Sequence, residues 1–160
     1  MSIPQQTPPV NEVARYAARG WPVIPCRPGS KAPATPHGFH DATVDAERIQ
    51  AWWTTWPTAN VAIRTGAASG LLVLDVDPRN EGDVTFKQLE AELGALPATA
   101  PRVRTPRGGV HIYLGYPAGA VVRSRAGALG PGVDVKAEGG YVVAPPSRVA
   151  FEDGTAGAYT

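Results

Sequence analysis

The fold of this chain is decided by the stretch Gly70-Leu71-Leu72-Val73-Leu74-Asp75-Val76-Asp77-Pro78. Four consecutive aliphatic residues between glycine and the acidic end predict a strand that is buried on both faces. Because side chains alternate along a strand, Asp75 and Asp77 share one face, with their Cα atoms about 6.5–7 Å apart. Two carboxylates on one face repel each other, and a shared Mg²⁺ or Mn²⁺ ion relieves that repulsion. The alternative is that the pair solvates the turn before Pro78.

Length, charge and cysteine content limit the classes of protein to consider. The chain has 160 residues and a formal net charge of +1, which favours one domain and requires any polyanion site to be a local patch. A single cysteine, Cys26, excludes internal disulfides and cysteine-based zinc sites and fits a reducing cytoplasm. Since neither a signal peptide nor an apolar run of membrane length is visible, we expect a cytoplasmic protein with no membrane partner.

The N-terminal part of the chain alternates between helical and extended patterns. Residues 1–10 are rich in proline and predict a flexible lead-in. Asn11 and Asp45 are suitable N-caps, and Gly20 and Pro57 end the helices that they begin. The tryptophans of the second helix recur at helical spacing and are assigned to the core. The expected elements are a helix over 12–19, a strand over 21–26, a helix over 45–55 and a strand over 60–66.

Basic and imidazole side chains occur in loops and at strand ends of this part. Lys31 lies in a loop after the first predicted strand, and Arg64 lies at the end of the strand 60–66. Ordinary solvated charge is the simplest interpretation of Lys31. His37 and His40 are separated by three positions, but Pro36 and a glycine place them in a loop, so we assign them as structural or surface histidines.

The middle of the chain predicts a hairpin followed by a crossover. The strand 60–66 and the strand that contains Asp75 are separated by a short turn over 66–70, and we expect them to pair as an antiparallel hairpin. Gly82-Asp83 precedes a predicted helix that runs to about Leu93, in which apolar residues recur with a period of 3.6.

A double glycine, Gly108-Gly109, separates a short strand that ends at Thr105 from a strand over 110–116. Glycines allow backbone N–H groups to approach a ligand closely, and Thr105 and Arg107 offer phosphate contacts; a simple hairpin turn is equally compatible. His111 lies on the polar face of the second strand, where its imidazole is able to donate to a phosphate oxygen.

The last third of the chain carries a third acid. A long connection over 117–131 contains Arg123 and Arg125 and is interpreted as either a functional flap or a disordered loop. Asp134 follows on a strand over 132–136, with Lys136 on the same face; the alternative to metal binding is an Asp–Lys surface pair. A turn over 138–140 then predicts that residues 141–144 return beside that strand.

Several of these motifs, taken in their order along the chain, are similar to the motifs of a known family. Asp75-Val76-Asp77, Gly109-Val110-His111 and Gly132-Val133-Asp134, with Gly139-Gly140-Tyr141 and Pro145-Pro146-Ser147, resemble the three ordered motifs of archaeo-eukaryotic primases. The chain is most similar to the bifunctional primase/polymerase (PrimPol) domains at the N-terminus of phage and plasmid replication proteins, from about Asn11 onward.

The resemblance implies an α+β catalytic core over residues 11–160. This core would contain an RRM-like sheet, mixed or antiparallel, flanked by helices and joined to a small N-terminal α/β unit. The implied activity is DNA-templated nucleotidyl transfer from dNTPs or NTPs on single-stranded or primed DNA. We expect the chain to be the N-terminal fragment of a larger replication protein with a downstream helicase domain.

The same resemblance implies roles for individual residues. Asp75, Asp77 and Asp134 would hold two Mg²⁺ or Mn²⁺ ions, without zinc, and His111 would bind the phosphates of the incoming nucleotide. The further candidates on the nucleotide side are Lys31, Arg64, Thr105, Arg107, Gly108 and Gly109.

Two other functions remain open at this point. A nucleotide-sugar transferase also uses Asp-x-Asp with Mn²⁺, but it needs a sugar and acceptor pocket for which no separate domain is visible. A non-catalytic RRM-like module that binds single-stranded nucleic acid would carry aromatic residues on its central strands, where this chain has Asp75, Asp77 and His111.

Overall fold

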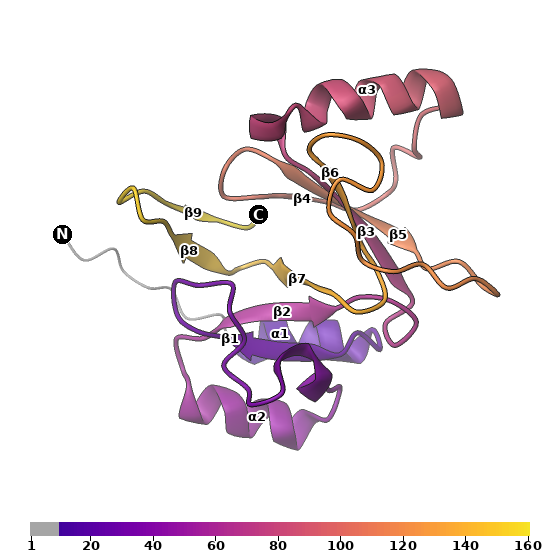
Figure 1. Ribbon diagram of the computed structural model, residues 1–160. Helices are drawn as coiled ribbons and strands as arrows, with labels where there is room; N and C mark the ends of the chain where they lie inside the picture. The colour runs from indigo at the N-terminus through magenta and orange to yellow at the C-terminus, as the bar shows by residue number, and fades with distance from the viewer. Residues whose placement is uncertain (1–9) are drawn as a thin grey trace. The chain divides into compact units, whose positions relative to one another are not determined.

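The computed structural model describes residues 10–160 and has a mixed α+β fold with antiparallel sheets, as predicted (Figure 1). The predicted lead-in lies outside the described residues except for Val10, which begins the first helix. The helices are α1 (Val10–Ala18), α2 (Ala46–Thr55) and α3 (Gly82–Leu93), with short 3₁₀ segments η1 (Gly38–Asp41) and η2 (Pro78–Asn80). None of the helices in residues 10–160 has the length and apolar character needed to span a bilayer.

The chain forms two compact units. The inserted unit is the continuous segment Thr65–Gly140, and the flanking unit consists of the residues up to Arg64 together with Tyr141–Thr160. The prediction of one catalytic domain over 11–160 stays a prediction, and each unit is described by itself.

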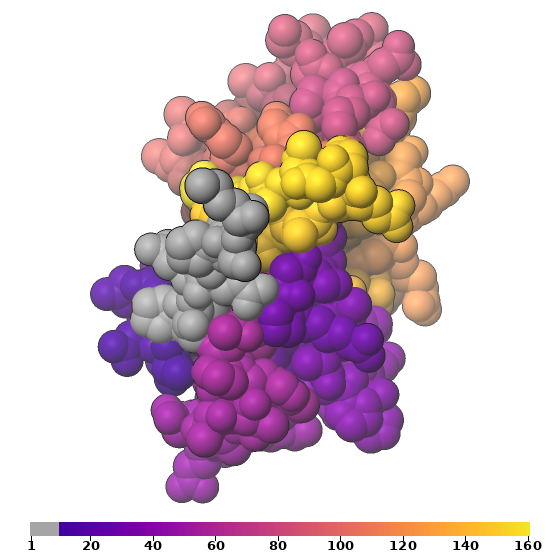
Figure 2. Space-filling model, turned by 90° about the vertical axis from the view of Figure 1, so that its left-hand side faces the viewer, coloured from indigo at the N-terminus to yellow at the C-terminus, as the bar shows by residue number. Residues whose placement is uncertain are grey.

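The flanking unit contains a three-stranded sheet in the order β1-β2-β7 and a two-stranded sheet β8-β9. Trp53 of α2 is buried and donates from Nε1 to the carbonyl of Ala59 at 3.3 Å, which confirms the assignment of this tryptophan to the core. The β8–β9 hairpin lies at the surface of the face shown in Figure 2 (yellow). The strands are β1 (Val23–Cys26), β2 (Asn60–Arg64), β7 (Tyr141–Ala144), β8 (Arg148–Ala150) and β9 (Ala156–Ala158).

The inserted unit contains a four-stranded sheet in the order β4-β5-β3-β6, in which every neighbouring pair is antiparallel. Because β3 and β4 both run antiparallel to β5, they are parallel to each other, and α3 makes the predicted crossover between them. The strands are β3 (Leu71–Val76), β4 (Arg102–Arg104), β5 (Val110–Gly115) and β6 (Val133–Lys136). One face of the sheet is an apolar core that includes Leu74, Val76, Ile112, Val133 and Val135, with Phe86 of α3 packed against it.

Two predicted strand pairings are wrong. Apart from one antiparallel bridge between Gly66 and Leu71, the strand 60–66 does not pair with β3, because β2 pairs with β1 and β7 in the flanking unit while β3 pairs with β5 and β6. For the same reason residues 141–144 do not return beside β6. A short connection rich in glycine serves equally well for a hairpin and for a chain that leaves one sheet and enters another, and the alternation of side chains does not distinguish the two.

The long connection over 117–131 is ordered by backbone hydrogen bonds. Arg125 exchanges both backbone hydrogen bonds with Val135 of β6, at 2.8 and 3.0 Å, and Ser124 donates to the carbonyl of Glu138 at 2.8 Å. Arg123 and Arg125 are both exposed. The connection therefore adds an irregular strand to the β6 edge of the sheet.

Candidate functional site

Three candidate residues form one row across the sheet of the inserted unit. Asp75 on β3 lies directly opposite His111 on β5 and directly opposite Asp134 on β6. Residues opposite each other on antiparallel strands have Cβ atoms about 4.5–5.5 Å apart and share a face. The face of this row is the one that does not carry Leu74 and Ile112, since side chains alternate along each strand. The sheet therefore gathers three side chains from segments far apart in the sequence.

His111 is more deeply buried than its place on a polar strand face suggested. Only 5% of the residue is exposed, and its Nε2 lies 3.6 Å from Oδ1 of Asp75, whose side chain is 27% exposed. The buried imidazole and the partly exposed carboxylate of Asp75 therefore lie side by side on the row.

Asp134 has two partners in the inserted unit. Its Oδ2 lies 3.2 Å from Nζ of Lys136, and its Oδ1 accepts a hydrogen bond from the backbone N–H of Gly127 at 2.8 Å. The Asp–Lys pair considered from the sequence is thus present. Both side chains are 29% exposed, and an ion pair of this kind contributes at most about 1 kcal/mol, so Lys136 is a weak competitor for a divalent cation.

Asp77 caps the turn that follows β3. Its Oδ1 accepts from the backbone N–H and Nε of Arg79, both at 3.0 Å, and its Oδ2 accepts from Nη2 of Arg79 at 2.7 Å and from Nδ2 of Asn80 at 3.1 Å. These hydrogen bonds, those from the Arg79 side chain foremost, hold the pKa of the Asp77 carboxyl below its usual value. The structure thus shows Asp77 in the turn-capping role that was the alternative to metal binding.

The backbone of Asp77 is hydrogen-bonded to two glycines, Gly82 and Gly132. The N–H of Asp77 donates to the carbonyl of Gly132 at 2.8 Å, and the N–H of Gly82 donates to the carbonyl of Asp77 at 2.9 Å. A Cβ on Gly82 would lie 2.6 Å from the carbonyl oxygen of Asp77 and would also meet the carbonyl oxygen of Gly132. Sequence reasoning missed this contact, because it placed Gly82 only in the turn that precedes the helix.

The double glycine forms the turn of the β4–β5 hairpin, which confirms the hairpin interpretation. The N–H of Thr105 donates to the carbonyl of Gly109 at 2.9 Å, and the N–H of Gly108 donates to the carbonyl of Thr105 at 3.1 Å. A Cβ on Gly109 would lie 2.6 Å from the carbonyl oxygen of Val76. Gly109 therefore permits a close approach of β5 to the end of β3, and half-buried Arg107 lies in the same turn.

Lys31 and Arg64 belong to the flanking unit and lie around one aromatic pair. The rings of Phe39 and Tyr141 have centroids 6.2 Å apart. Tyr141 donates from its hydroxyl to the backbone carbonyl of Lys31 at 3.2 Å, and the Arg64 guanidinium lies 5.7 Å from the Phe39 centroid. Sequence reasoning identified the two cations but missed the rings, since Phe39 lies between two histidines in a loop without periodicity.

His37 and His40 are exposed, in agreement with the surface assignment. Nδ1 of His37 lies 3.2 Å from Oδ1 of Asp41, which also lies 3.7 Å from Arg48. This is an ordinary surface ion cluster.

The arrangement fits a divalent cation at two of the three predicted ligands. Asp75 and Asp134 are like charges placed directly opposite each other; Lys136 compensates part of this charge, and a bound cation would compensate more. Two carboxylates are also the number that Mg²⁺ commonly takes from a protein. Across residues 10–160 no group of three or more His, Cys, Asp or Glu side chains is assembled for a metal ion. The row Asp75–His111–Asp134 is therefore not a preformed site with three ligands, and Asp77 is hydrogen-bonded to Arg79.

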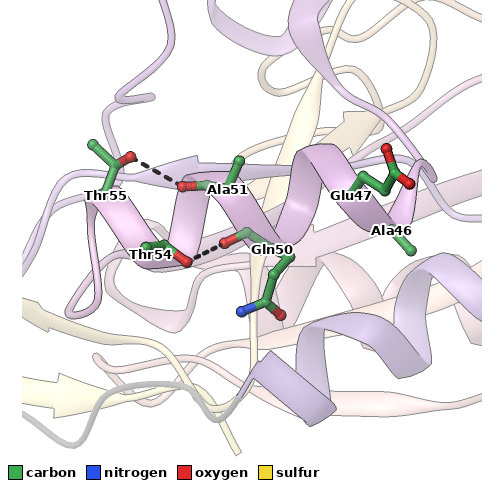
Figure 3. Close-up of a pocket in the computed structure, with 6 residues that line it drawn as sticks. All are labelled: Ala46, Glu47, Gln50, Ala51, Thr54 and Thr55. Carbon is green, nitrogen blue, oxygen red and sulfur yellow. Dashed lines mark hydrogen bonds between the residues drawn. The ribbon is translucent and has the colours of Figure 1, made fainter.

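A shallow hollow in the flanking unit runs along the outer side of α2 (Figure 3). The hydroxyls of Thr54 and Thr55 donate to carbonyls of their own helix, at 2.8 and 3.0 Å. The lining residues are Ala46, Glu47, Gln50, Ala51, Thr54 and Thr55, of which only Glu47 is ionisable. This hollow offers no candidate chemistry.

Comparisons with known proteins agree with the resemblance of the motifs. The model of the family Prim-Pol, described as bifunctional DNA primase/polymerase, N-terminal, matches residues 13–160. The match includes the row Asp75–His111–Asp134, the turn at Gly108-Gly109 and the two glycines that contact Asp77, Gly82 and Gly132. No curated protein matches the chain.

Proposed function

We propose, from the premise that this chain belongs to the Prim-Pol family of bifunctional DNA primases/polymerases, that it synthesises and extends primers by metal-dependent nucleotidyl transfer. The substrates would be dNTPs or NTPs and single-stranded or primed DNA, in phage or plasmid replication. One observation supports the proposal best. The row Asp134–Asp75–His111 places two carboxylates and an imidazole side by side on adjacent strands.

In this mechanism the residues of the chain would mainly position the metal ions and the nucleotide, and they would take little part in proton transfer. Asp75 and Asp134 would hold the first Mg²⁺ or Mn²⁺ ion, and Asp77 would share in holding a second. When bound, such ions would supply positive charge that lowers the pKa of the primer 3′-hydroxyl and offsets the charge on the α-phosphate and the leaving pyrophosphate. The 3′-oxygen forms a bond to the α-phosphorus as the bond to the β-phosphate oxygen breaks, and the hydroxyl proton passes to water.

His111 would orient the triphosphate. Its Nε2 lies beside Asp75, so its imidazole N–H would be placed to donate to a phosphate oxygen of a nucleotide bound at the carboxylates. The turn Thr105–Gly109 would add backbone N–H groups at the end of the same hairpin. Lys31 and Arg64 belong to the flanking unit, and their role in nucleotide binding stays a prediction.

The test compares variants that each lose one carboxylate charge, either on the row Asp75–His111–Asp134 or away from it. Asp75→Asn and Asp134→Asn are expected to lower incorporation of a labelled dNTP on a primed single-stranded template by about 100-fold or more, with Mg²⁺ or Mn²⁺. Asp83→Asn, which removes an equally charged but exposed side chain from the first turn of α3, should retain activity. Circular dichroism checks that each variant is folded. Near-normal incorporation by Asp75→Asn would refute the metal role.

The same assay separates the rival functions. A non-catalytic nucleic-acid module would bind single-stranded DNA equally well with and without EDTA and would incorporate nothing. A nucleotide-sugar transferase would hydrolyse or transfer from a nucleotide sugar in the presence of Mn²⁺ and ignore the template.

A further inference from the structure

We propose that Arg79 is an internal counter-ion of Asp77, which a divalent cation must displace from the carboxylate before Asp77 becomes a ligand. This inference rests on the proposed function only in taking Asp77 as a cation ligand. It assigns to Arg79 the role of a positioning residue that competes with the metal.

The first step is the occupancy of the carboxylate. An ionised carboxylate has about four acceptor positions on its two oxygens. Asp77 uses four: two on Oδ1, from the backbone N–H and Nε of Arg79, and two on Oδ2, from Nη2 of Arg79 and Nδ2 of Asn80. Nε and Nη2 bind the two oxygens as a fork, the strong geometry for an arginine and a carboxylate. A cation that approaches Asp77 therefore meets donors at every acceptor position.

The second step is to ask which partner moves. Asp77 is fixed through its backbone by Gly132 and Gly82, and its side chain is 24% exposed. The Arg79 side chain is 52% exposed, so it swings into water by rotating about its own bonds. Exchange of Arg79 for a cation therefore requires no change in the backbone of the turn.

The third step is charge. Nη2 of Arg79 lies 2.7 Å from Oδ2 of Asp77, so the positive charge of the guanidinium lies directly against the carboxylate. Arg79 thus compensates part of the negative charge of the site when no metal is bound.

The experiment measures Mn²⁺ binding to the full chain without nucleotide, by electron paramagnetic resonance of the free ion. Arg79→Ala is expected to bind Mn²⁺ about two- to fivefold more tightly than the wild type, since an exposed ion pair has been removed from a ligand. Lys87→Ala, which removes an exposed cation from α3, is the matched control and should leave the affinity unchanged. Arg79→Lys retains the charge without the fork and should fall between Arg79→Ala and the wild type.

Repeating the measurement in an Asp77→Asn chain identifies the residue at which Arg79 and the cation compete. If Arg79 competes at Asp77, the gain from Arg79→Ala disappears in an Asp77→Asn chain. A gain of equal size in that background would mean that Arg79 acts only as a distant charge on Asp75 and Asp134, and would overturn the inference. Unchanged or weaker binding by a folded Arg79→Ala chain would do so as well.

The outcome is independent of nucleotide incorporation. A chain that shows this competition but incorporates no nucleotide would contradict the proposed function and leave the role of Arg79 standing. A chain that incorporates nucleotide but shows no competition would do the reverse.

Discussion

Gly82→Ala tests whether the close packing around Asp77 outweighs helix propensity. Gly82 is the first residue of α3, and propensity alone predicts that alanine there stabilises the protein by up to about 1 kcal/mol. The structure predicts the opposite sign. A Cβ would lie 2.6 Å from the carbonyl oxygen and 2.7 Å from the nitrogen of Asp77, and would also meet the carbonyl oxygen of Gly132.

All three of these neighbours are backbone atoms, so none of them gives way by rotating a side chain. Ordinary contacts of a Cβ are 3.4–4 Å, and the turn after β3 or the start of α3 must shift by several tenths of an ångström. Overpacking of this kind costs about 1–3 kcal/mol. For a chain of this size we expect a melting temperature lower by about 2–12 °C.

The assay is thermal unfolding followed by circular dichroism, with Gly115→Ala as the matched control. Gly115 ends β5 in the same sheet, and a Cβ there would meet nothing within 4 Å, so its free energy of unfolding should change by less than about 0.5 kcal/mol. A Gly82→Ala chain as stable as Gly115→Ala, or more stable, would refute the reasoning.

Three further predictions concern single side chains. Ser147→Ala removes the buried hydroxyl that accepts the N–H of Val61 at 2.9 Å, so the free energy of unfolding should fall by about 1–3 kcal/mol; an unchanged thermal melt would contradict this. Because Arg79 lowers the pKa of Asp77, their pair stabilises the fold above the unfolded pKa of about 3.9 and loses this effect as the pH falls through the lower folded pKa. Arg79→Ala should therefore be less stable at pH 6, by no more than about 1 kcal/mol, and match the wild type at about pH 2; a difference that persists in acid would exclude the linkage. Burial raises the pKa of the Cys26 thiol to about 12, so a thiol reagent at pH 8 should label the protein only after denaturation, and rapid labelling of the native chain would show that this site opens.

The sequence predicted the faces of the strands better than their partners. Side-chain alternation placed His111 and Asp134 on polar faces, and the order of the motifs suggested that they meet Asp75; the register of β3, β5 and β6 shows that they do. Pairing was wrong where the chain passes between units, because alternation describes one strand and carries no information about its neighbour.

The contacts around Asp77 were beyond sequence reasoning for a different reason. Arg79 is two positions away from Asp77, a spacing at which side chains of a strand would share a face without forming a fork. The fork exists because η2 turns the chain back immediately after β3. Turn geometry of this kind depends on Gly82 and Gly132, which are 50 positions apart in the sequence and meet only in the folded unit.

The passage of the chain between the two units has a practical consequence for engineering. Thr65 and Gly140, the first and last residues of the inserted unit, are joined by a backbone hydrogen bond of 3.0 Å. Arg64 and Tyr141, the residues on the other side of each crossing, are register partners in β2 and β7. A short designed loop between Arg64 and Tyr141 would convert β2 and β7 into a hairpin, and linking Gly140 back to Thr65 would permit new termini elsewhere in the excised segment. The chain is therefore suited to production as two separate polypeptides, and mixing them tests whether the two units associate without a covalent link.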